Sequence, residues 1–192
     1  MKKYGSVTHG GQEYKTVEIG TQTWMAANLN YITTNNKSKC YGNTDTYCNT
    51  YGRLYDWSTA MGFDSSCNSS SCPVQSNHRG ICPSGWHIPS DAEWGVLVTF
   101  ADGSATKLKA TSGWDSNGNV YTDDYGFSAL PGGAGFSDDS FDGVGNSSFW
   151  WNARESGAST AYIRAMANSY SGVVNTNHNS KSNLFSVRCV MN

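Results

Sequence analysis

The sequence carries little charge and no long hydrophobic run. Only 15% of its 192 residues are charged, the net charge is -2, and lysine and arginine do not cluster anywhere. Because nucleic-acid binding depends on clustered basic side chains, we expect no nucleic-acid partner. A membrane-spanning helix needs about 18 consecutive apolar residues, and no such run occurs. We therefore expect no membrane insertion.

The first residues lack the apolar stretch of a secretion signal. The chain begins MKKYGSVTHGGQEY, where two lysines are followed by polar residues and glycines. A signal peptide needs an apolar region after its basic start. We expect residues 1–11 to be an N-terminal extension of a single domain covering residues 1–192, a length that suits one hydrophobic core. The leader was then removed, the domain was excised from a longer protein, or export needs no leader.

Cysteine spacing typical of zinc sites is also absent. The six cysteines include no Cys-x-x-Cys pair, and the four histidines are scattered along the chain. Zinc ligands usually include closely spaced cysteine pairs, so we favour disulfides over a metal site. The predicted bonds are two local ones and one long-range one, Cys40–Cys48, Cys67–Cys72 and Cys82–Cys189. Disulfides imply an oxidising compartment, and hence an extracellular or cell-surface location.

The chain is instead rich in glycine, aromatic residues, serine and asparagine. It has 21 glycines, 11 tyrosines and 7 tryptophans. Extracellular recognition domains have this composition, because rigid rings and small polar side chains make contacts at low entropic cost. An ordinary loop-rich β protein is the alternative. We expect the tryptophans to form the core, except Trp114, which lies in a loop of small polar residues.

Hydrophobic periodicity predicts two helices in the first half of the chain. Apolar residues at helical spacing, with Gly62 as a stop, indicate a helix over residues 54–61. The capping box between Ser90 and Glu93 predicts a second helix, which ends at Asp102-Gly103. The apolar face of the second helix would consist of Trp94, Leu97, Val98 and Ala101.

Short strands are predicted around these helices. Two strands flank a turn at Gly20 within residues 14–28, with Val17, Ile19 and Trp24 in the core. Residues 63–79 form a surface loop. After residue 108 only short strands fit, over residues 127–130, 149–153, 161–166 and 184–190. The prediction is an α+β fold, with two helices packed on a loop-rich antiparallel sheet that disulfides stabilise.

Several motifs resemble one bacterial family. They are YKTVEIGTQTWMAANLNY (14–31), YGRLYDWSTAM (51–61), CPSGWHIPSDAEW (82–94), DDYGFSALPGG (123–133), the Trp150-Trp151 pair and FSVRCV (185–190). From about residue 12 to the C-terminus, the chain resembles the Fibrobacter succinogenes major paralogous domain. The resemblance implies a C-type-lectin-like fold, shared with formylglycine-generating enzymes. It also implies a secreted or surface protein of a bacterial envelope or pilus, or of a phage tail tip.

The resemblance further implies a variable C-terminal surface. Family members are frequent targets of diversity-generating retroelements, which mutate adenines in a C-terminal coding segment. The family pattern WWS-A/S-TE reads Trp151-Asn152-Ala153-Arg154-Glu155 here, and Leu184 stands where GFSVRC has its first glycine. Residues 168–183 also contain five asparagines. We expect either retroelement mutagenesis or an asparagine-rich solvated loop.

Amide, aromatic and guanidinium side chains gather in this region and form the predicted binding surface. Amides offer paired donors and acceptors, arginine grips carboxylates, and tyrosine adds rigid contact area. Alternation over residues 161–166 indicates a strand with one packed and one free face. The expected ligand is a protein or glycan on another cell or particle, and a merely solvated loop is the alternative. The predicted ligand-binding residues are Asn152, Arg154, Tyr162, Arg164, Asn168, Tyr170, Asn175, Asn177, His178 and Asn179.

Calcium is the one cofactor that the sequence suggests. Oxygen-bearing side chains alternate after Trp114 around a glycine that allows a tight turn, as a hard cation favours. The terminal glutamate of an EF-hand is missing, and so are the calcium motifs of sugar-binding lectins. The alternative is a turn in which these side chains bond their own backbone. The candidate calcium ligands are Asp115, Asn117, Asn119, Asp123 and Asp124.

Enzymatic motifs are absent from the sequence. The chain has no GxSxG, P-loop or HExxH motif, and Asp91 and Glu93 are explained as capping residues, while Glu155 has no evident partner. Formylglycine-generating enzymes need a cysteine pair near the C-terminus, whereas Cys189 stands alone there and is expected in a disulfide. We therefore expect a binding module and no enzyme. The alternatives are a structural surface domain and a sulfatase-modifier-like enzyme.

Overall fold

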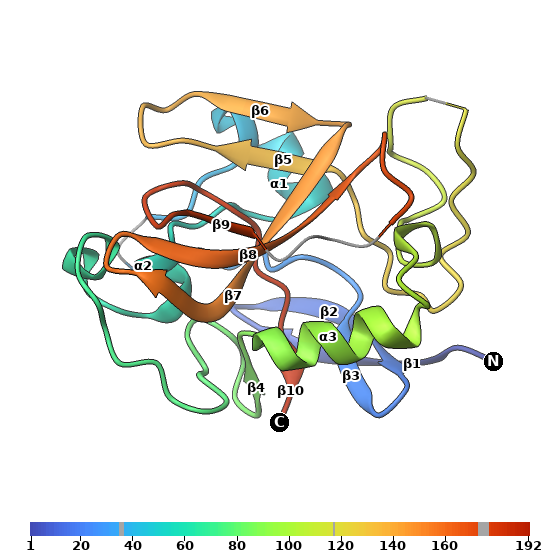
Figure 1. Cartoon of the computed structure of the whole chain (residues 1–192), viewed down its shortest axis with the longest axis horizontal. Coiled ribbons are helices and arrows are strands. Elements are labelled where there is room, and N and C mark those ends of the chain that lie inside the picture. The colour runs from blue at the N-terminus through green and yellow to red at the C-terminus, as the bar shows by residue number, and fades with distance from the viewer. Residues whose placement is uncertain (35–36, 117, 173–176) are drawn as a thin grey trace.

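The computed structural model describes residues 1–34, 37–116, 118–172 and 177–192. This part of the chain contains two five-stranded sheets, three α-helices and short 3-10 turns (Figure 1). The strand orders are β1-β2-β3-β10-β4 and β6-β5-β7-β8-β9. Helices and antiparallel strands occur together in one packed unit, so the predicted α+β class is confirmed. The strands form two sheets, however, where the sequence predicted one.

The first sheet brings the two ends of the chain together. Its antiparallel strands are β1 (Lys3–His9), β2 (Gln12–Ile19), β3 (Gln22–Met25), β4 (Trp86–His87) and β10 (Val190–Met191). The predicted turn at Gly20 and the buried core residues beside it are confirmed. Residues 3–9, expected in an extension, pair with β2 along their whole length. Gly10 and Gly11 both have positive φ, which gives this hairpin its tight turn.

The second sheet comes from the C-terminal half. Its strands are β5 (Gly132–Gly135), β6 (Phe141–Val144), β7 (Ser147–Gly157), β8 (Thr160–Ala167) and β9 (Asn177–Ser180). Neighbouring strands are antiparallel except β5 and β7. The strands predicted over 149–153 and 161–166 lie within β7 and β8. Those predicted over 127–130 and 184–190 are wrong for most of their length, because these residues form isolated bridges and only Val190 enters a strand.

The two predicted helices are α2 (Trp57–Met61) and α3 (Asp91–Phe100). The capping box forms as expected, because Glu93 N donates to Ser90 Oγ (3.3 Å) and Ser90 N donates to Glu93 Oε2 (2.8 Å). The helix α2 begins later than predicted, since Leu54 bridges to Lys39 instead of joining it. A further helix, α1 (Asp45–Tyr51), was not predicted. Only one of its residues is buried, so it lacks the apolar periodicity by which helices are recognised.

Tryptophan side chains fill much of the interior, as predicted. One buried cluster includes Trp94 and Trp150, and the other includes Trp57 and Trp151; all four are fully buried. Trp114 packs against the first of these clusters and donates its indole N–H to Ala129 O (3.0 Å). The expected exception, Trp114, therefore also supports the core.

All three predicted disulfides are present: Cys40–Cys48, Cys67–Cys72 and Cys82–Cys189. The third bond joins residues that are 107 positions apart and ties the segment before β10 to the segment before β4. Disulfides on this scale are compatible with an extracellular location. Within the described ranges, no helix has the length and apolar character needed to cross a bilayer.

Candidate ligand-binding surface

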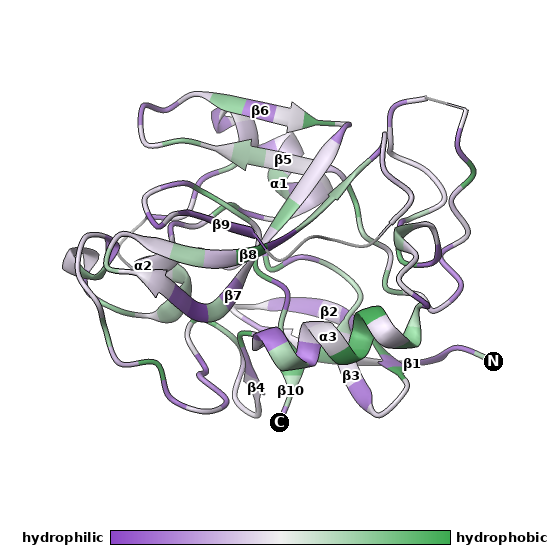
Figure 2. Ribbon diagram, viewed as in Figure 1, coloured by the Kyte–Doolittle hydropathy of each residue, from purple (hydrophilic) through white to green (hydrophobic). Residues whose placement is uncertain are grey.

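Strands β7, β8 and β9 pair so that alternate side chains leave the core. Strand β8 follows the predicted alternation as far as Ile163, because Ala161 and Ile163 are buried and Tyr162 between them is partly exposed, whereas Arg164 and Met166 are buried where exposed residues were expected. Tyr162 lies opposite His178 of β9 in the register of the sheet. Residues opposite each other in antiparallel strands share a face, so these two rings lie on the same side. Figure 2 shows that β9 is strongly hydrophilic.

Three side chains form a continuous ladder on this face. The guanidinium carbon of Arg154 lies 4.5 Å from the ring centroid of Tyr162. The rings of Tyr162 and His178 are 6.3 Å apart and meet edge to face. The side chain of Arg154 is 55% exposed, and His178 is exposed too. We call Arg154, Tyr162 and His178 the β7–β9 surface; it offers a cation, a ring face and an imidazole to a ligand.

The first residue of α3 anchors this surface. Asp91 Oδ1 accepts hydrogen bonds from Arg164 Nη2 (2.6 Å) and Asn152 Nδ2 (3.2 Å), and Asp91 Oδ2 lies 3.6 Å from Arg154 Nη1. Burial lowers the pKa of the Arg164 guanidinium, and the charge of Asp91 opposes that shift. One carboxylate thus faces two guanidinium groups, so the local charge is positive. This balance suits a ligand with an acidic group.

Asn152 and Arg164 are not exposed, so their predicted place on the binding surface is wrong. Asn152 is 0% exposed and Arg164 is 6% exposed. The start of α3 covers this part of β7 and β8, and Arg164 Nη2 also donates to Asp91 O (3.2 Å). Their physical role is to hold Asp91, and through it Arg154, in place.

Asn168 and Tyr170 follow the end of β8 and lie apart from the β7–β9 surface. The carbonyl of Asn168 accepts from Asn119 Nδ2 (2.9 Å), and the carbonyl of Tyr170 accepts from Lys109 Nζ (2.9 Å). The ring of Tyr170 is exposed. These two predicted contact residues therefore belong to a loop that packs on residues 109–121, and the structure does not bring them to the ladder.

The asparagines of β9 alternate with His178. Asn177 and Asn179 lie opposite buried residues of β8, so they belong to the other face of the strand. Asn179 Oδ1 accepts from Asn183 Nδ2 (2.7 Å), which orders its side chain locally. Asn177 is exposed at the sheet edge. Asn175, also predicted to bind, lies outside the described residues.

Among the predicted calcium ligands, Asp123 uses both carboxylate oxygens in hydrogen bonds within the protein. Both oxygens of the buried Asp123 accept from Ser128, from its main-chain N–H (2.8 Å) and its hydroxyl (2.7 Å). Asp115 N and Asn119 Nδ2 donate to main-chain carbonyls of other loops. The described chain holds no group of three His, Cys, Asp or Glu side chains that could bind an ion. The remaining candidates are exposed or outside the described residues: Asp124 and Asn117.

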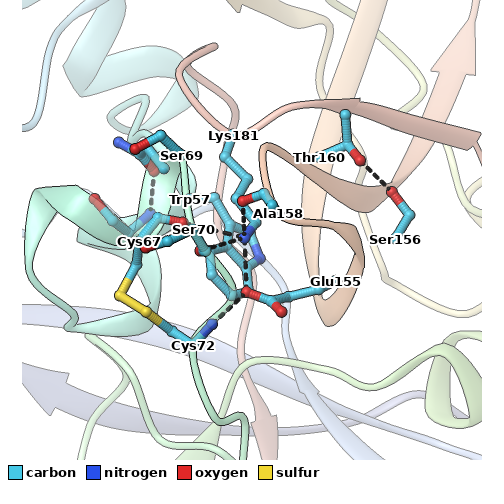
Figure 3. Close-up of polar contacts among 12 residues, drawn as sticks. Trp57, Cys67, Ser69, Ser70, Cys72, Glu155, Ser156, Ala158, Thr160 and Lys181 are labelled. Atoms are coloured by element: carbon cyan, nitrogen blue, oxygen red, sulfur yellow. Dashed lines mark hydrogen bonds and ion pairs between the residues drawn. A yellow bond between two sulfur atoms is a disulfide. The ribbon is translucent and has the colours of Figure 1, made fainter.

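Lys181 is a buried cation that the sequence did not reveal. Its side chain is 0% exposed, and Nζ lies 2.6 Å from Glu155 Oε1 (Figure 3). Glu155 also accepts from Cys72 N (2.9 Å), so its carboxylate is used to hold the Cys67–Cys72 loop and Lys181. No local pattern indicates the contacts of Lys181, because its partners are far away in the chain. Nζ also donates to three main-chain carbonyls, those of Cys67, Ser70 and Ala158.

Comparison with known families places the chain in one of them. The model of the Fibrobacter succinogenes major domain matches residues 17–191. The chain belongs to this family. The match runs from β2 into β10, so it includes the β7–β9 surface and all three disulfides. No curated protein and no solved structure matches significantly.

In this Fibrobacter succinogenes major domain, every cysteine is bonded in a disulfide.

A second polar network joins Glu93 in the first turn of α3 to His87 of β4 and to Asn192 at the C-terminus. His87 Nε2 is 2.7 Å from Glu93 Oε1, and His87 Nδ1 is 2.7 Å from Asn192 Oδ1. Burial lowers the pKa of His87, but the hydrogen bonds to Glu93 and Asn192 outweigh it, so the net pKa is raised. Glu93 of the capping box thus contacts β4 and, through His87, the residue that follows β10.

Proposed function

We propose that the chain is a ligand-binding module of an extracellular or cell-surface protein, and that it is not an enzyme. The observation that carries this proposal is the exposed ladder of Arg154, Tyr162 and His178. These side chains come from three neighbouring strands that pack on the core. A protein or glycan on another cell or particle that offers an acidic group would contact the ladder.

A preorganised frame supports this role. Asp91 holds Arg154 from one side, and Lys181 ties the β7–β8 hairpin to the Cys67–Cys72 loop. Side chains that are ordered before binding lose less entropy, so a smaller contact area is sufficient. We propose a C-type-lectin-like fold for this frame. That β1 and β10 belong to the same sheet is in keeping with it, because such folds bring their termini together.

We also propose that retroelement mutagenesis acts on this surface. Arg154 departs from the family pattern and is exposed, whereas Asn152 departs from it but is buried. The fold would tolerate variation at Arg154, Tyr162 and His178 better than at Asn152. A reverse-transcriptase gene beside the locus, with a near-copy of the coding segment for 150–190 that differs at adenines, would support diversification. A locus without either would contradict it.

The proposal that the chain is no enzyme rests on its nucleophiles. The six cysteines are bonded to one another, so none supplies the thiolate that a sulfatase-modifier-like reaction requires. The Ser90 hydroxyl donates to Glu93 Oε2 (2.7 Å) as part of a helix cap. A purely structural envelope domain is the competing role, and it predicts that no ligand depends on the β7–β9 surface.

The variants Arg154→Gln and Tyr162→Ala test the binding proposal on an array of acidic and neutral glycans and purified surface proteins. We expect each variant to weaken binding to the ligands that the wild type selects by about tenfold, or ~1.4 kcal/mol. The first removes the cation and the second removes the ring beneath it. The melting temperature should change little, because both side chains are partly exposed.

A matched pair elsewhere on the molecule provides the control. Lys15 Nζ lies 3.6 Å from the ring centroid of Tyr4, on the β1–β2 hairpin. Lys15→Gln and Tyr4→Ala remove the same kind of contact, and both variants should bind like the wild type. If the two pairs lose binding equally, or if the double variant of Arg154 and Tyr162 still binds fully, the proposed surface is wrong.

A further inference from the structure

A cavity of about 310 Å³ lies beside the C-terminal end of α2. Four segments form it: the end of β1, residues 31–34, the last turn of α2 with its cap, and residues 79–82. The volume is at the lower end of the range for small-molecule sites. The β7–β9 surface contributes none of the described lining residues, so the two features are separate.

The walls of this cavity are held rigidly. Gly80 has a φ of +51°, and a Cβ atom there would lie 2.2 Å from Ala60 O, so only glycine allows residues 79–82 to approach α2 this closely. Ile81 N donates to Ala60 O (3.0 Å), and the adjacent Cys82 is in a disulfide. His9 Nε2 lies 3.0 Å from Ile81 O and connects β1 to the same segment. A cavity built this way exists before any ligand arrives.

Hydroxyl-bearing side chains line one side of the cavity. Thr33, Thr34 and Thr59 all belong to the lining. The Thr59 Oγ1 atom is buried from solvent, whereas Thr34 is exposed, so the Thr34 hydroxyl is the one that a ligand reaches. A hydroxyl both donates and accepts hydrogen bonds, so it can pair with a ligand hydroxyl.

The charge of the lining is basic. Arg79 Nε donates to Cys82 O (3.0 Å), which orients the guanidinium group at the cavity. No Asp or Glu occurs among the described residues of the lining. The ring of His9 lies 4.4 Å from that of Tyr31, and burial lowers the pKa of His9, so the imidazole is neutral near pH 7. The cavity therefore combines one fixed cation with an aromatic wall and favours a singly charged anion.

We propose that this cavity binds a small hydroxylated carboxylate of the sugar-acid type, either free or at the end of a glycan. The carboxylate pairs with Arg79, a ligand hydroxyl pairs with the Thr34 hydroxyl, and the apolar face of the sugar ring rests against Tyr31. This assignment does not depend on binding at the β7–β9 surface.

An NMR titration of the ¹⁵N-labelled chain with D-glucuronate tests the site, with D-glucose as the neutral control. We expect saturable shifts at the amides of Gly62, Gly80 and Ile81 with glucuronate, and at least tenfold weaker binding of glucose. Arg79→Gln should weaken glucuronate binding at least tenfold, while Lys15→Gln, which removes a cation outside the cavity lining, leaves it unchanged. If glucuronate, galacturonate and N-acetylneuraminate all fail to give saturable shifts at these amides, the proposal is wrong.

A glucuronate-terminated disaccharide distinguishes the two ligand sources. If the ligand is the end of a glycan, the disaccharide binds at least as tightly as free glucuronate, because the second sugar leaves through the cavity mouth. If the ligand is a free sugar acid, the disaccharide binds at least tenfold more weakly. Both outcomes support ligand binding in the cavity, and they show whether the ligand is a free sugar acid or the end of a glycan.

Discussion

Buried cations of this protein are stabilised in two different ways at the residue scale. Lys181 is paired with the carboxylate of Glu155. Arg188 instead donates to Asn28 Oδ1, and burial lowers its pKa to about 9. Lys109 donates only to main-chain carbonyls among its described hydrogen bonds, and burial lowers its pKa to about 8. A buried charge costs less when acceptors surround it, so these cations order the loops that supply the acceptors.

Lys181→Met should destabilise the fold strongly. The change leaves Glu155 largely buried without its cation and frees three carbonyls, so we expect the free energy of unfolding to fall by about 3–5 kcal/mol. Urea unfolding followed by tryptophan fluorescence measures the loss. Lys3→Met is the control, because the Lys3–Glu18 pair is exposed and should contribute less than about 1 kcal/mol. Similar small losses in both variants would contradict the structural role of Lys181.

At the element scale, the N-terminal end of α3 connects the two sheets. The carboxylate of Asp91 accepts hydrogen bonds from Arg164 and Asn152 of the second sheet. Glu93 is hydrogen-bonded to His87 of the first sheet, and His87 is also hydrogen-bonded to Asn192, which follows β10. The first turn of α3 is therefore more than a helix start, because the carboxylates of Asp91 and Glu93 also position strands of the two sheets.

The His87 network predicts a pH dependence of stability. Hydrogen bonds raise the pKa of His87 above 6.5, so its stabilisation is complete below 6.5 and is lost as the pH rises through the folded-state pKa. Burial alone would raise the pKa of Glu93, but bonds from His87 and Ser90 lower it below 4.5 overall, so that stabilisation is lost as the pH falls through the lowered value. The difference in unfolding free energy between wild type and His87→Gln should be greatest between about pH 4.5 and 6.5.

Urea unfolding of both proteins from pH 4 to pH 9 measures that difference. His178→Gln is the control, because His178 is exposed on β9 and the variant should follow the wild-type pH profile. A difference between wild type and His87→Gln that stays constant above pH 6.5 would show that the histidine does not bind its extra proton in the folded state.

At the scale of the whole molecule, the fold depends on contacts between distant parts of the chain. Strand β10 lies between β3 and β4, so the C-terminus completes the sheet that the N-terminus begins. The Cys82–Cys189 bond lies beside this junction and is fully buried. Closing so long a segment restricts the unfolded chain more than closing a short loop does.

The three disulfides should therefore contribute unequally. Replacing Cys82 and Cys189 by alanine should lower the free energy of unfolding by about 5 kcal/mol, whereas replacing Cys40 and Cys48 should lower it by about 2.5 kcal/mol, because the second loop is much shorter. Differential scanning calorimetry of the two double variants, with Cys67→Ala/Cys72→Ala as a further short-loop control, measures this order. Equal losses in the long-loop and short-loop variants would contradict it.

The sequence by itself was sufficient where a signal is local or has a strong pattern. The capping box at Ser90, the Gly20 turn and the existence of strand β8 depend on neighbours in the chain, and each was predicted correctly. The disulfide pairing followed from short spacings and one remaining pair. The glycine-rich β5 and the polar α1 were missed, because neither has an apolar period that identifies an element.

Only the tertiary structure decided which polar side chains face outward. Alternation divides β7 and β8 into two faces, but the placement of α3 over one part of them buried Asn152 and Arg164 and left Arg154 and Tyr162 accessible. The partners of Lys181 and the cavity beside Thr59 likewise bring together segments that are far apart in the chain. Burial depends on packing between such segments, and a local sequence pattern contains no information about which distant segment will pack against it.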